Sequence, residues 1–233
     1  MEKRLHRRFP VWALAAAMAS ACYYDASTDA VRPADDYPLP DGGSAAELPG
    51  WPDPTTRREL LINSEASSLR LTVADLIAHT EMPGNVPVLG GVLGFSPDDS
   101  GQLALDELQV VLGDVHVPTQ SSGEVVLTGL RLDSEPGLAL PVAWREPGHQ
   151  GFLKAPVVLH LSWKVIGSSG RAWPLAEQTL HGATLYLHVA VDSSARLRAD
   201  VLGIDTGTFW HWDGIYALKD AVLTVVAREP GIG

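Results

Sequence analysis

The last three-quarters of the chain alternates apolar and polar residues with a period of two, in short runs. In the run VVLHLSWKV, Val157 falls on one face and His160 on the other. In EVVLTGLRLD, the pattern places Val126, Leu130 and Leu132 together. The same alternation recurs in SLRLTVADL, TLYLHVAV, ARLRADV and AVLTVVARE. Because successive side chains of a β-strand point to opposite faces, these runs predict strands with one buried face.

Clusters of turn-forming residues separate the alternating runs and set the expected fold. They divide the region into roughly nine to eleven strands, and they read SPDDSGQ, TQSSGE, EPGHQG, IGSSGR and VDSSAR. Alternation of this kind is typical of antiparallel sheets that have one face on a core and one in water. We therefore expect residues 60–233 to form a single all-β domain, an antiparallel β-sandwich. A β-barrel or a curved, lipid-carrier-like sheet is the alternative.

Residues 22–59 lack this periodicity. They contain six prolines and eight acidic residues against three basic ones, with few apolar residues. Such a segment cannot bury enough apolar surface to offset the entropy lost on ordering. We therefore expect a disordered, Pro- and Asp-rich linker that precedes the β domain.

The N-terminal residues have the layout of a secretory signal peptide. MEKRLHRRFP carries four Lys or Arg residues, and the next eleven residues, VWALAAAMASA, are uncharged and end in small side chains. This apolar run is too short to span a bilayer, which takes about 20 residues. We expect residues 1–21 to be removed during export.

Cys22 follows this segment directly. The sequence ASAC resembles the lipobox of bacterial lipoproteins, in which a cysteine becomes lipidated and forms the new N-terminus, although Ala19 stands where the lipobox usually has Leu. Cys22 is the only cysteine, so it cannot form an internal disulfide. The resemblance implies a lipid anchor at Cys22, and Tyr23 in place of Asp favours the outer membrane by the enterobacterial sorting rule. A soluble secreted protein is the alternative.

The negative net charge of the chain limits which partners it can bind. The chain has a formal net charge of −11, and removal of the basic N-terminal segment makes it more acidic. A surface of this sign repels nucleic acid, so we expect no nucleic-acid partner.

Two groups of residues could carry a binding site. Imidazole suits copper and zinc, and His160, His188 and His211 could form such a metal site, because the first two lie on the polar faces of expected neighbouring strands.

The segment GTFWHWDGIYALKD contains four aromatic residues, Phe209, Trp210, Trp212 and Tyr216. They could pack over the core or form an exposed patch that binds a glycan or a protein.

The aromatic segment also resembles the Trp-rich segment of periplasmic copper-binding proteins associated with methanobactin uptake. Those proteins carry Phe-Trp-x-Trp followed by Gly-Tyr, whereas Ile215 separates Gly214 from Tyr216 here. The resemblance covers about ten residues, and it implies copper as the ligand.

No catalytic motif such as GxSxG, HExxH or a P-loop is present in the sequence. We therefore expect a non-catalytic binding or structural module of the cell envelope, without a cofactor. A periplasmic copper- or zinc-binding protein and a carrier of an apolar ligand are the alternatives. A glycan hydrolase would need a pair of carboxylates, for which Asp205, Asp213 and Asp220 are available.

Overall fold

The computed structural model describes residues 56–118, 123–137, 139–146, 150–173, 175–191, 196–207 and 209–230. The expected signal peptide, Cys22 and nearly all of the expected linker lie outside the described residues. The first strand begins at Arg58, two residues before the expected start of the β domain. The described part of the chain holds no long apolar helix of the kind that could cross a membrane.

The described residues contain thirteen strands and one turn of 3-10 helix, η1 (Ser64–Ala66), joined by turns and loops. The strands are β1 (Arg58–Ile62), β2 (Ser68–Asp75), β3 (Thr80–Pro97), β4 (Leu103–Leu112), β5 (Val115–Pro118), β6 (Glu124–Ser134), β7 (Leu140–Pro141), β8 (Ala143–Glu146), β9 (Gln150–Ile166), β10 (Ala176–Val191), β11 (Leu197–Asp205), β12 (Trp210–Trp212) and β13 (Tyr216–Arg228). All their pairings are antiparallel. The prediction of an all-β antiparallel fold is therefore confirmed.

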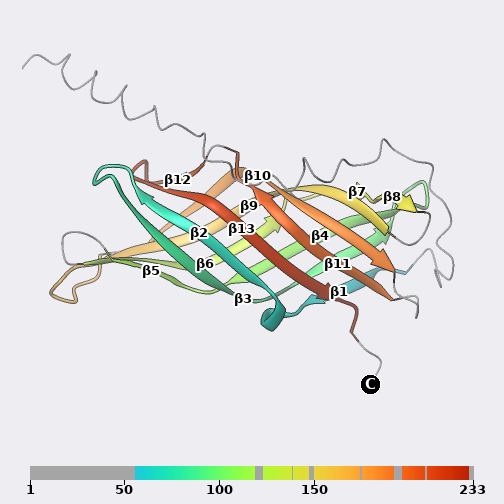
Figure 1. Cartoon of the computed structure of the whole chain (residues 1–233), viewed down its shortest axis with the longest axis horizontal. Coiled ribbons are helices and arrows are strands. Elements are labelled where there is room, and N and C mark those ends of the chain that lie inside the picture. The colour runs from blue at the N-terminus through green and yellow to red at the C-terminus, as the bar shows by residue number, and fades with distance from the viewer. Residues whose placement is uncertain are drawn as a thin grey trace, which may run out of the picture. The chain divides into compact units, whose positions relative to one another are not determined.

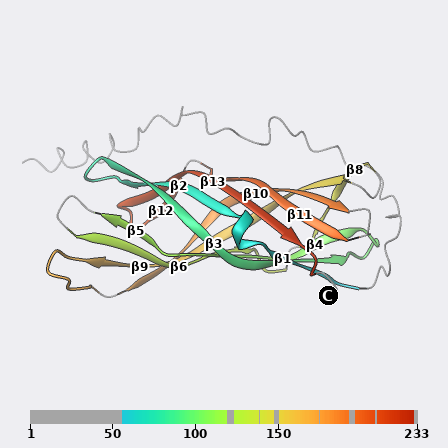
Figure 2. The same cartoon turned by 60° about the horizontal axis from the view of Figure 1, so that its bottom comes forward.

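The pairings of β3 distinguish two ends of the sheet. Arg58, where the chain enters the sheet, pairs with Phe95 near the end of β3, whereas Thr80 at the start of β3 pairs with Asp75. We call the end near Arg58 the proximal end. The opposite end, with the turns at residues 76–79, 167–173 and 213–215, is the distal end. In Figures 1 and 2 the β2–β3 turn and the start of β1 lie at opposite ends of the strand assembly.

Toward the proximal end, backbone pairing closes the sheet into a ring. The pairings run from β1 to β3, β4, β6, β9, β10, β11 and β13, and β13 pairs with β1 again. Each of these eight strands thus has a partner on both sides, and opposite sides of one sheet pack around one core. At the proximal rim, within the described residues, β7 pairs only with β4 and β8 only with β9.

Toward the distal end, the ring has two seams. Here β2, β5 and β12 occupy the places that β1, β4 and β11 fill at the proximal end. Within the described residues, β5 pairs only with β6 and β12 only with β13, so no backbone ladder joins β5 to β3 or β12 to β10. At the seam between β10 and β12, side-chain hydrogen bonds from Gln178 of β10 replace a backbone ladder. Gln178 donates to the His211 carbonyl (3.5 Å) and accepts from the Asp213 N–H (3.0 Å).

Bulges bend the long strands and change which residues face inward. One lies in β6 between Thr128 and Arg131, where Gly129 has a φ of 62°. An extra residue at a bulge reverses the alternation that follows it. The prediction that Val126 shares a face with Leu130 and Leu132 is therefore wrong, because the bulge separates them.

One continuous core fills the ring. It combines the buried side chains of nearly every strand, among them Leu60, Phe95, Leu127, Leu159 and Leu185. The apolar faces that alternation predicts for β9, β10 and β11 point into this core, and Trp163, Val165 and Val191 are partly buried against it. Because the core spans both ends, it fixes the positions of the turns that project from them.

Closure between β3 and β4 depends on Gly91. A Cβ at Gly91 would overlap the backbone carbonyl oxygen of Gln109 and lie 2.8 Å from Ile62 Cδ1. A Cβ at the neighbouring Gly90, which has a similar φ of 152°, would meet nothing within 4 Å. We predict that Gly91→Ala lowers the free energy of unfolding by about 3 kcal/mol or more, and Gly90→Ala by about 1–2 kcal/mol. Urea denaturation measures both free energies of unfolding. An equal decrease in the two variants would show that the close approach of β3 to β4 does not require glycine at position 91.

Candidate functional site

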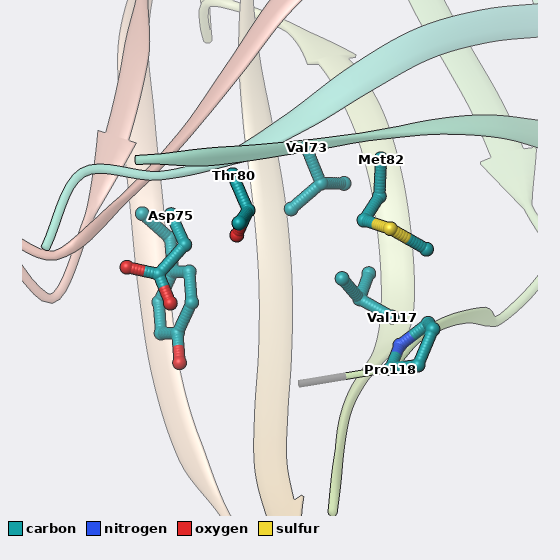
Figure 3. Close-up of a pocket in the computed structure, with 7 residues that line it drawn as sticks. Val73, Asp75, Thr80, Met82, Val117 and Pro118 are labelled. Atoms are coloured by element: carbon teal, nitrogen blue, oxygen red, sulfur yellow. The ribbon is translucent and has the colours of Figure 1, made fainter. Parts of the chain in front are cut away.

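The seam between β3 and β5 holds a small hollow at the distal end (Figure 3). Its walls are contributed by β2, β3, β5 and β13, and its lining residues are Val73, Asp75, Thr80, Met82, Val117, Pro118 and Tyr216. Its volume is about 10 Å³, which is room for a single water molecule. The hollow combines apolar side chains with the hydroxyl groups of Thr80 and Tyr216 and the carboxylate of Asp75.

Tyr216 is the aromatic residue of this hollow. Its ring stacks on Trp212 with centroids 5.1 Å apart and planes 20° apart. Burial raises the pKa of Tyr216, and the carboxylates of Asp75 and Asp213 raise it further. The phenol therefore stays neutral at physiological pH and can donate a hydrogen bond at the distal end.

The aromatic segment divides between core and surface. Trp210 and Trp212 are buried, and neither indole N–H has an acceptor among the described residues. Phe209 and Tyr216 are half-buried, and the Phe209 ring meets His211 edge to face, with centroids 5.6 Å apart. The two tryptophans therefore pack in the core and cannot belong to an exposed patch; Phe209 and Tyr216 alone of the four remain accessible.

The three candidate histidines do not come together. His160 pairs across the sheet with Thr179, and His188 pairs with Phe152. These positions lie eight residues apart along β9, which corresponds to about 26 Å. His211 lies on the separate short strand β12. The described residues contain no group of three or more His, Cys, Asp or Glu side chains that could hold a metal ion, so the expected site from His160, His188 and His211 does not form.

His160 instead belongs to a polar row on the outer face of the sheet. Its Nε2 lies 3.3 Å from Asp133 Oδ2, and its Nδ1 lies 3.2 Å from Thr179 Oγ1. Arg131 donates to the same Asp133 oxygen at 2.7 Å. The row joins β6, β9 and β10 by side-chain hydrogen bonds. No spacing in the sequence could have revealed it, because it depends on the register of three strands.

A second hollow lies at the proximal end and is charged. It has a volume of about 250 Å³ and is lined by Arg196, Leu197, Arg198, Arg228 and Glu229. Most of these charges are already paired: Arg228 donates to Asp200 (2.7 Å), and Glu229 accepts from Arg58 (2.6 Å). This pairing fastens the last strand to the first.

Two carboxylates at turns, those of Asp98 and Asp205, accept hydrogen bonds from the backbone. The hydrogen bond from the Ser100 hydroxyl (2.6 Å) lowers the pKa of Asp98 most. The N–H groups of Gln102 and Ser100, each at 2.8 Å, lower this pKa further. Asp205 accepts from the Gly207 N–H at 2.8 Å. These contacts are those of turn-forming aspartates.

Comparisons with known proteins add no relative. No protein-family model matches the chain, and it matches neither a curated protein nor a solved structure. Any functional conclusion must therefore come from its own residues.

Substitution of Gln178 tests how much its hydrogen bonds stabilise the seam between β10 and β12. We predict that Gln178→Leu lowers the free energy of unfolding by about 1 kcal/mol, because it removes the hydrogen bonds to His211 and Asp213. Gln150→Leu, at an exposed position at the start of β9, is the matched control. If both variants unfold at the same urea concentration as the unmodified chain, the side chain does not hold the seam.

His188 should make stability depend on pH. Burial lowers the pKa of His188, Arg198 lowers it further, and Asp200 opposes them. The unfolded chain binds this proton near pH 6.5, so the contribution of His188 is complete above that pH and is lost as the pH falls through the lowered folded pKa. We predict that His188→Gln reduces the fall in urea midpoint between neutral and mildly acidic pH. His181→Gln, at an exposed position, is the control. If the urea midpoint of His188→Gln falls with pH as much as that of the unmodified chain, His188 is not the source of the pH dependence.

Proposed function

We propose that this chain is an exported lipoprotein, attached to a membrane of the cell envelope through an acylated Cys22. The β unit would be a non-catalytic module that presents its surface to an envelope partner. The observation that carries the proposal is the order of residues at the N-terminus: a basic segment, eleven uncharged residues, small side chains, and then the only cysteine of the chain.

The path of the chain into the β unit is compatible with such a tether. The linker leads to Arg57 at the proximal end, where this side chain forms ion pairs with Glu59, Asp106 and Glu107. These contacts tie the start of the β unit to β4. From there, β3 runs 18 residues to the distal end, a span of roughly 60 Å.

The packing of the interior favours the outer surface as the working surface. The core side chains fill the ring, and the hollow in the β3–β5 seam has room for a single water molecule. An acyl chain or comparable apolar ligand would require the core to repack. Among the functions considered, presentation of an outer surface therefore fits this packing better than transport of an apolar ligand.

The position after Cys22 bears on the choice of membrane. Tyr23 stands where an Asp would retain an enterobacterial lipoprotein at the inner membrane. We therefore propose attachment to the outer membrane.

Expression of the full chain in a bacterium that processes lipoproteins tests the anchor. We predict that the protein fractionates with membranes and has the mass of residues 22–233 plus a lipid group, because acylation makes attachment effectively permanent. Cys22→Ser should abolish the lipid mass, and Ser20→Ala, which keeps a small side chain before the cut, should not. An unmodified mature chain in the soluble periplasmic fraction would refute the anchor.

A further inference from the structure

Two arginines face each other across the ladder between β11 and β13 (Figure 1), beside the hollow at the proximal end. Arg198 and Arg228 are direct partners in this antiparallel pairing, and both line the hollow. Their side chains lie on the outer face, because the neighbouring Leu197, Ala199 and Ala227 belong to the core. Like charges directly opposite each other destabilise a sheet. An anionic group that contacts both guanidinium groups would therefore stabilise this part of the ring.

One carboxylate, that of Asp200, lies beside the two arginines. Its Oδ1 accepts from Arg228 Nη1 at 2.7 Å. Its Oδ2 lies 3.9 Å from Arg198 Nη2, which is beyond hydrogen-bonding distance. Arg228 Nη1 also donates to the Ala227 carbonyl at 2.7 Å. Among the described residues, the Arg198 side chain therefore makes no hydrogen bond, and Nε and Nη2 of Arg228 have no acceptor.

The other charges that line the hollow cancel one another. Glu229 accepts from Arg58 Nε at 2.6 Å, and this pair is neutral as a whole. Arg196 also lines the hollow, and we set its charge against that of Asp192, which lies outside the described residues. The two arginines of the ladder then remain against the single carboxylate beside them. The hollow therefore has an excess of positive charge, although the chain as a whole is acidic.

The acidic cluster at the same end of the sheet lies on other strands. Glu59 pairs with Arg57 at 2.9 Å, and Asp106 and Glu107 contact the same guanidinium group. Asp106 and Glu107 belong to β4, which β3 and β1 separate from β13. Three strand spacings amount to about 14 Å, whereas the Debye length at physiological salt is about 8 Å. These two carboxylates are therefore largely screened from the hollow.

From this geometry we propose that the proximal hollow binds a phosphate group, which accepts hydrogen bonds from Arg198 and from Nε and Nη2 of Arg228. Guanidinium groups match phosphate oxygens in pairs, and such charge-assisted hydrogen bonds are about twice as strong as neutral ones. A phosphate group has enough oxygens to meet two guanidinium groups at once. The volume of about 250 Å³ has room for several water molecules, and thus for a phosphate group. The inference does not rest on acylation of Cys22, since it concerns only residues of the β unit.

Phosphate titration followed by NMR of the arginine side chains tests this site in the mature chain, residues 22–233, with Cys22→Ser so that no lipid is attached. At constant ionic strength, we expect inorganic phosphate to shift the Nε–Hε signals of Arg198 and Arg228, with a Kd on the order of 1 mM. Arg198→Gln should weaken binding roughly tenfold, because it removes one of the two guanidinium groups. Arg198→Lys should weaken it less, because the charge remains without the paired donors.

Glycerol 3-phosphate distinguishes two sources of the phosphate group. Binding of this ester with an affinity similar to that of inorganic phosphate would show that the hollow accepts phosphate carried by a larger molecule. Binding of inorganic phosphate alone would show a site for the free ion. Both results support a phosphate site.

Arg70→Gln is the matched control. Arg70 is exposed on β2, and its partner Val222 lies six residues from Arg228 along β13, which corresponds to about 20 Å. This variant should bind phosphate as the unsubstituted chain does.

The urea midpoint of Arg198→Gln separates loss of the site from loss of the fold. It should match that of the unsubstituted chain, because the Arg198 side chain makes no hydrogen bond among the described residues. Unchanged Arg198 and Arg228 signals at high phosphate concentration would overturn the proposal, and so would equal weakening by Arg70→Gln. Neither result would bear on the lipid anchor, which the mass measurement tests separately.

Discussion

Closure of the proximal half of the sheet by backbone hydrogen bonds is the constraint on which the rest of this structure depends. Eight strands can return to their start only if β3 pairs with β4 on one side and with β1 on the other. This places the β3 backbone so close to that of β4 that only glycine fits at Gly91. Once the ring is closed, the inward faces of all its strands share one core, and each of the eight strands has a partner on both sides.

The two ends of the ring follow from that closure. The proximal end receives the chain and is tied by Arg57 and by the Arg58–Glu229 ion pair. The distal end has seams in place of ladders, and it is there that the small hollow, the half-buried Tyr216 and the projecting Ile77 and Trp173 occur.

The sequence predicts those parts of the fold that depend on alternation alone. The all-β class and the buried faces of β9, β10 and β11 could be predicted because neighbouring side chains point to opposite faces. The 18-residue strand β3 could not, since Pro83, Pro87, Gly90 and Gly91 break its pattern, although ladders with β2, β1 and β4 hold it. Within WHW, alternation groups Trp210 with Trp212 but does not say which face is buried.

Register is what limits prediction of the candidate site. His160 and His188 were expected on polar faces of adjacent strands, and they do lie on β9 and β10. The pairing nevertheless places them far apart, and it brings His160 to Asp133 and Thr179 instead. Pairing register depends on turns and bulges such as that at Gly129, which are tertiary features without a distinctive local sequence.

Native-state hydrogen exchange of the backbone amides tests the central claim, that the ring is closed proximally and seamed distally. Exchange reports local opening, and residues paired on both sides open least. The account predicts slow exchange along β3 from Val92 to Phe95, where β1 and β4 flank it, and faster exchange at the β3–β5 and β10–β12 seams. Rapid exchange from Val92 to Phe95, or equal protection at both ends of β3 and β10, would contradict it.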